Sequence, residues 1–64
     1  MDPIQHLYMA IRQENLKIME VNQKIQSNTG DVQLAYSTIL SVHVSTAAGL
    51  TTTIHQHIST SLSQ

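Results

Sequence analysis

Residues 2–28, DPIQHLYMAIRQENLKIMEVNQKIQSN, decide the fold because they combine a helix start signal with a regular apolar repeat. Asp2 suits the N-cap position, and Pro3 suits the first helical position, where the missing N–H of proline costs nothing. Isoleucine then recurs every seven residues, and other aliphatic residues fill the intermediate heptad positions. The repeat consists of Ile4, Leu7, Ile11, Ile18, Val21 and Ile25. The pattern predicts a helix over about 3–27 with a coiled-coil type of seam.

One member of this seam is polar, because Glu14 occupies a position where an aliphatic side chain is expected. Such a residue either faces a partner or fixes the register of the packed helices. The cluster Ser-Asn-Thr-Gly-Asp at 27–31 follows the repeat and is typical of a turn. Within it, Gly30 is the residue that we expect to end the first helix.

The second half of the chain has a different chemistry, since residues 32–64 contain no Lys, Arg, Asp or Glu. Its many Ser, Thr and β-branched residues weaken the helix preference, and residues 40–45 alternate as a strand would. A helical heptad explains a longer stretch of the sequence than the strand pattern does. This second seam consists of Leu40, His43, Ala47, Leu50, Ile54, His57 and Ser61. We therefore expect an all-α fold with a second helix over about 32–62, joined to the first by a turn at 28–31.

The size and composition indicate that the chain needs a partner to hold a fixed shape. It has 64 residues, no Cys, Trp or Phe and two Tyr, so it has neither disulfides nor the large aromatics of a compact core. Small scaffolds without such supports usually oligomerise. The two seams therefore predict a coiled-coil or helical-bundle packing in which the partner is the chain itself, within a larger protein assembly. They leave the number of chains open.

Several function classes do not fit this sequence. It contains no catalytic motif and only two glycines, so it is not expected to be an enzyme or to bind a cofactor. A net charge of −1 without a basic cluster argues against nucleic acid as a partner. The beginning of the sequence lacks the basic and continuous apolar regions of a signal peptide.

The histidines of the second half are the sharpest local feature. His43 and His57 both fall in the second seam, where copies arranged around an axis would form rings that protonation destabilises. His55 and His57 form an HxH pair whose spacing is similar to that of the iron-binding segments of some phage tail fibres. On a helix their side chains diverge by about 200°, so we expect no metal site, and the two residues are only weak candidates.

The Ser/Thr-rich, aromatic-poor and heptad-bearing composition resembles that of the stalks and anchors of viral and phage fibres. This resemblance implies a non-enzymatic structural or assembly protein, such as a virion or phage-particle component: a fibre stalk, an anchor or a minor capsid protein. Two alternatives remain open. Residues 34–54 are uncharged and long enough for a small membrane-active or membrane-spanning protein. The chain also suits a small helical binding module that folds on a partner.

Overall fold

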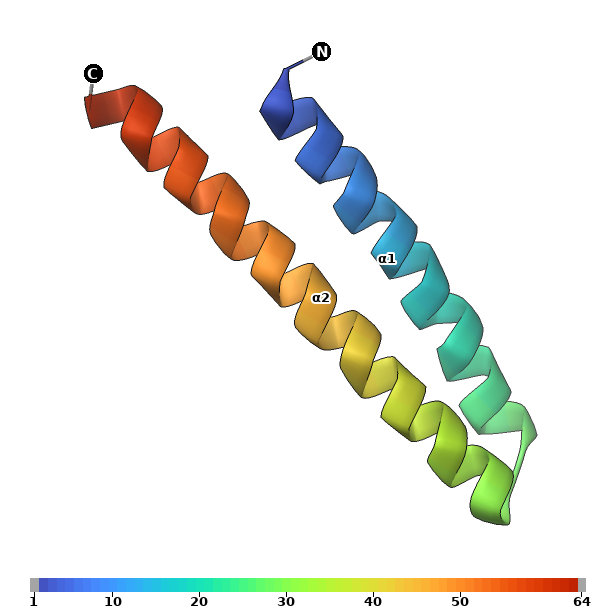
Figure 1. Ribbon diagram of the computed structural model, residues 1–64. Helices are drawn as coiled ribbons and strands as arrows, with labels where there is room; N and C mark the ends of the chain where they lie inside the picture. The colour runs from blue at the N-terminus through green and yellow to red at the C-terminus, as the bar shows by residue number, and fades with distance from the viewer. Residues whose placement is uncertain (1, 64) are drawn as a thin grey trace.

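The chain forms a hairpin of two antiparallel helices in the computed structural model (Figure 1). The structure describes residues 2–63. Helix α1 spans Pro3–Ser27 and helix α2 spans Gly30–Ser63, and no strand occurs in the described range. The predicted all-α fold of two helices joined by a turn is confirmed, and the second half, for which a strand was the competing interpretation, is helical throughout.

The start of α1 follows the predicted capping pattern. The Asp2 carboxylate accepts a hydrogen bond from the backbone N–H of Ile4 at 2.9 Å, and Pro3 occupies the first helical turn. The backbone N–H of His6 donates to the Asp2 carbonyl at 3.3 Å. These contacts satisfy backbone groups that the first turn of a helix otherwise leaves without a partner.

The turn between the helices is shorter than expected. Helix α1 ends at Ser27 as predicted, but α2 begins at Gly30, two residues before the expected start. Asn28 is extended, with φ −126° and ψ 165°, and it reverses the chain. Gly30 has a φ of +66°, which strains any residue with a Cβ, and it opens α2 rather than ending α1.

Side-chain amides replace the glycine cap that the sequence suggested. The Asn28 amide donates to the Lys24 carbonyl at 2.8 Å, and the Gln33 amide donates from α2 to the Ile25 carbonyl at 3.0 Å. The last carbonyls of a helix lack partners within the helix, so these two bonds allow α1 to end without a left-handed residue directly after it.

The two helices differ in length, and this difference leaves one end of α2 without a neighbour. Helix α1 has 25 residues and α2 has 34, so α2 is longer by about 14 Å at 1.5 Å per residue. Because the short turn aligns the helices at its own end, the excess lies at the opposite end, where both termini are found (Figure 1). The hairpin is accordingly elongated, with extents of 52 × 17 × 12 Å.

Candidate functional site

The apolar seams of the two helices lie against each other within one chain. All ten residues predicted for the oligomer seam are half-buried or buried, and Ile54, 4% exposed, is the only buried residue in the described range. They are Ile4, Leu7, Ile11, Ile18, Val21, Ile25, Leu40, Ala47, Leu50 and Ile54. The structure therefore places the predicted seam residues in a contact inside the hairpin. A role for them between chains stays a prediction.

The register of the hairpin follows from two hydrogen bonds that cross between the helices. Glu14 meets His43, and Gln33 reaches the carbonyl of Ile25. Since one step forward along α1 corresponds to one step back along α2, the two pairs agree on the register to within one residue. That register brings Ile4 level with the buried Ile54, which explains why α1 covers this residue so well.

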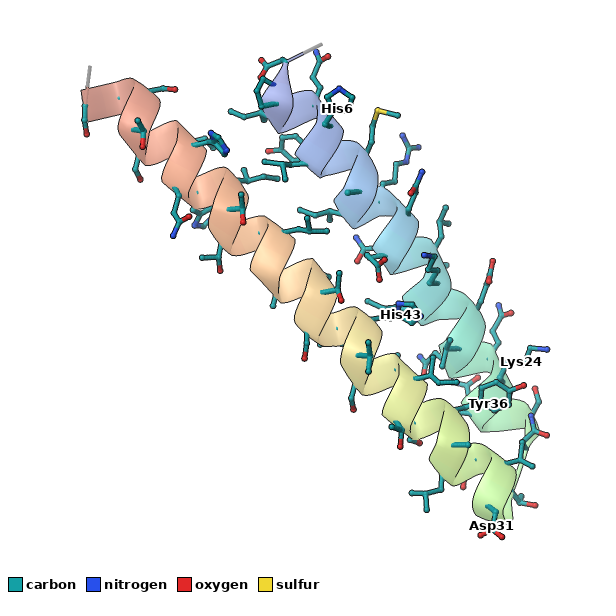
Figure 2. The ribbon with its side chains drawn as sticks, viewed as in Figure 1. His6, Lys24, Asp31, Tyr36 and His43 are labelled. Carbon is teal, nitrogen blue, oxygen red and sulfur yellow. The ribbon has the colours of Figure 1, made fainter. Side chains whose placement is uncertain are left out.

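Tyr36 belongs to the seam although the sequence analysis did not include it. It is half-buried and lies between the helices near the turn (Figure 2). Tyr36 precedes Leu40 by four residues, so extending the heptad one step toward the turn would have found it.

The polar positions of the two seams meet in one layer. The Nδ1 atom of His43 lies 2.7 Å from an Oε atom of Glu14, with side-chain exposures of 23% and 15%, and His43 points from α2 toward α1 (Figure 2). The Lys17 ammonium lies 3.5 Å from the other carboxylate oxygen, on the outer side of the layer. Glu14 therefore faces a partner within its own chain, and a register-fixing role for this layer stays a prediction.

The contacts of Glu14 alter its acidity. The hydrogen bond with His43 is the main cause that holds the pKa of the Glu14 carboxyl below its ordinary value, and the positive charge of Lys17 acts in the same direction. Partial burial opposes both effects because it disfavours the charged carboxylate. The net result is a carboxylate that is stabilised inside an otherwise apolar seam.

The other histidines do not join this layer. His57, predicted for the second seam, is exposed and lies in the part of α2 that extends beyond the start of α1. His55 is exposed as well, and both residues are on a helix, so their side chains diverge by about 200°. Among residues 2–63, no group of three or more potential ligands is arranged to hold a metal ion.

Most of the hydroxyl side chains of α2 are bonded to their own helix. Nine Ser and Thr hydroxyls in α2 donate to the carbonyl four residues earlier, at 2.9–3.2 Å. Thr38, Ser45, Thr52 and Ser59 recur every seven residues and form an exposed hydroxyl row along the side away from α1. Because a bonded hydroxyl needs no water partner, much of this polar surface can be covered at little cost.

Large apolar side chains remain exposed on both helices. They are Tyr8, Met9, Leu16, Met19, Val32, Leu34, Ile39, Val42, Val44, Ile58 and Leu62. Scattered exposed apolar residues are normal, but eleven large ones beside a single buried residue within residues 2–63 are not, because a stable domain buries most of its large apolar side chains. The hairpin therefore leaves many large apolar side chains exposed to solvent.

Two shallow depressions lie on the surface of the described residues. One is lined by Gln56, His57, Thr60 and Ser61, and the other lies near the end of α1. Neither includes the Glu14–His43 pair. Within residues 2–63, no helix has the combination of length and apolar character that crossing a membrane requires.

Comparisons with known proteins add no family to this description. No protein-family model matches the chain, and no curated protein or solved structure shows significant similarity to it.

Proposed function

We propose that this chain is a non-enzymatic assembly protein that associates with further copies of itself through its helical surface. The main observation behind the proposal is that residues 2–63 include eleven exposed large apolar side chains but one buried residue. A 64-residue chain without cysteine has no disulfide to offset so small a core. Association is the remaining way to cover that surface with the residues present.

The distribution of charge supports the same function. Every charged residue lies between Asp2 and Asp31, so α2 is uncharged from Val32 onward. Free protein surfaces normally carry about a quarter or more charged residues. A helix of this length without charge therefore suits a buried position in an assembly better than a free surface. The narrower function of a virion or phage-particle component rests on compositional resemblance alone and stays a prediction.

A second candidate function follows from the contact between the two seams. Since α1 and α2 cover each other's heptad residues within one chain, the hairpin can form without a second copy. That property suits a small helical binding module, which would stay monomeric until an unrelated partner is added.

Molar mass measured against protein concentration separates the two functions. For the assembly protein, light scattering after size exclusion should give a defined oligomer at micromolar concentration, and the helical signal in circular dichroism should rise with concentration. A helical monomer that persists up to about 1 mM, well above the dissociation constants of specific interfaces, would contradict self-assembly and favour the binding module.

A further inference from the structure

The heptad repeat of α1 continues into α2 without a change of phase. Counting in sevens from the first isoleucine gives isoleucine or valine at every a position as far as the first half of α2. These a positions are Ile4, Ile11, Ile18, Ile25, Val32 and Ile39. The corresponding d positions are Leu7, Glu14, Val21, Asn28, Ala35 and Val42. β-branched aliphatic residues at a are typical of coiled coils, and here the repeat crosses the turn between the two helices.

The hairpin uses only the α1 part of this repeat. The a and d residues of α1 are half-buried, whereas in α2 the side chains of Val32, Ile39 and Val42 are exposed. The seam with which α2 meets α1 contains Leu40 and Ile54 instead, and it lies one residue later in the heptad. A shift of one residue turns the side chains by about 100° around a helix. Two different sides of α2 therefore carry an apolar repeat: one faces α1, and the other continues the repeat of α1.

No residue of the turn excludes a helix. The break consists of Asn28 and Thr29, and residues 28–31 contain no proline. Gly30 would occupy an f position of the continued heptad, on the outside of a coiled coil, where glycine weakens the helix without obstructing its packing. The Gln33 amide donates to the Ile25 carbonyl at 3.0 Å, and this bond across the turn exists only while the chain is reversed. The break is therefore maintained by contacts that form in the hairpin.

We propose that the turn at residues 28–30 is a hinge, through which the chain exchanges between the hairpin and one continuous helix that associates with further copies as a coiled coil. This inference rests on the proposed function, because it names the conformation in which the chain associates. The seam of α1 is covered in both states. The states differ in the side of α2 that is covered: α1 covers the side of Leu40 and Ile54 in the hairpin, and other copies cover the side of Val32 and Ile39 in the coiled coil.

The protein concentration decides between the two states. A single continuous helix would leave the whole repeat exposed to water, so an isolated chain is more stable as the hairpin. Glu14 acts in the same direction, because its carboxylate lies 2.7 Å from the His43 ring in the hairpin, whereas at a d position of a coiled coil it would bury a charge without this partner. Association alone covers the repeat of the continuous helix, so this state should gain population as the concentration rises.

The distance between two spin labels within one chain distinguishes the states. Gln5 and Thr52 are both exposed, and they lie at the same level of the hairpin in the register of the Glu14–His43 pair. Labels on Gln5→Cys and Thr52→Cys should lie less than about 30 Å apart in the hairpin, since the axes of packed helices are about 10 Å apart. In a continuous helix they should lie about 70 Å apart, at 1.5 Å per residue. Labelled chains are diluted with an excess of unlabelled chain, so that only distances within one chain are measured, and the share of the long distance should grow with total concentration.

Substitutions in the turn should shift this exchange in opposite directions. Gly30→Ala strains the positive φ of the turn and favours a continuous helix, so it should lower the concentration at which half of the chains are extended by at least about 10-fold. Asp31→Pro should abolish the long distance, because Asp31 lies in the first turn of α2, where proline is tolerated, but would lie in the interior of a continuous helix. Asp31→Ala removes the same charge without the proline ring. As the matched control, it should keep the long distance and change that concentration by less than about 3-fold.

The outcomes separate the hinge from the proposed function. A long distance that grows with concentration, increases in Gly30→Ala and is absent from Asp31→Pro supports the hinge. If the molar mass rises with concentration but the distance stays short in the natural chain and in Gly30→Ala, the chain associates as a hairpin, so the hinge is wrong while the proposed self-assembly stands. A long distance that persists in Asp31→Pro contradicts the hinge as well. If the natural chain stays a helical monomer with the short distance up to about 1 mM, both the hinge and the proposed function are wrong.

Discussion

Replacing Ile54 by alanine tests whether the two seams meet within one hairpin in solution. The change removes three carbon atoms from the one buried side chain in residues 2–63. At about 0.8 kcal/mol per buried methylene, the transfer term is about 2.4 kcal/mol. The surrounding seam residues are only half-buried, so they can move into the space that the substitution leaves. We therefore expect the free energy of unfolding to fall by about 2–3 kcal/mol, which is at the lower end for such substitutions. A single core in a chain of this size rarely supplies more than about 3–5 kcal/mol of stability, so the loss is a large fraction of it.

The matched control is Leu34→Ala, which also removes three carbon atoms from α2 but from a side chain that is 67% exposed. That change should alter stability by less than about 0.5 kcal/mol. Urea titration followed by circular dichroism measures both values, at a concentration where the natural chain is monomeric. Equal losses for the two variants would refute the reasoning, because the contact that stabilises the helices would then not centre on Ile54. If Ile54→Ala is unfolded in water, titration in a stabilising osmolyte recovers the comparison.

Further predictions concern the polar layer and the ends of the helices. Because folding lowers the pKa of Glu14, the carboxylate contributes its full stabilisation at pH values above the ordinary pKa of 4.5, and this contribution is lost as pH falls through the lowered pKa. Glu14→Gln should therefore reduce the fall in melting temperature that is measured as the pH is lowered into this range, and Glu20→Gln should leave that fall unchanged. Replacing both Glu14 and His43 by leucine should raise the melting temperature. The double variant should also permit registers between α1 and α2 that the Glu14–His43 pair excludes, and cross-linking of cysteines introduced into the two helices should then give a mixture of products. Gly30→Ala should cost about 1–2 kcal/mol in urea titration, since the positive φ and not crowding is the obstacle; an unchanged stability would mean that the turn readjusts. Asp2→Ala should cost about 1 kcal/mol through the lost N-cap, and Asp2→Asn, which can still accept the bond, should not.

The seam of α1 could be predicted from the sequence because its signals are local. The N-cap at Asp2, the isoleucine repeat and the end of the helix at Ser27 depend only on residues within a few turns of one another. The second half was harder to assign, since its Ser, Thr and β-branched residues favour neither state strongly. The hydroxyls that made a strand plausible bond to carbonyls of α2 instead, so they are compatible with the helix that the heptad predicted.

The sequence by itself determined that the chain is helical, where the helices separate and which side of each helix is apolar. Only the tertiary structure decided that these sides cover each other within one chain, that Glu14 meets His43 across 29 positions of sequence, and that His57 lies beyond the end of α1. The physical reason is that periodicity fixes the direction of an apolar side, whereas the surface that covers it depends on how the turn reverses the chain. That turn depends on the conformations of Asn28 and Gly30 and on the reach of Gln33 from the next helix.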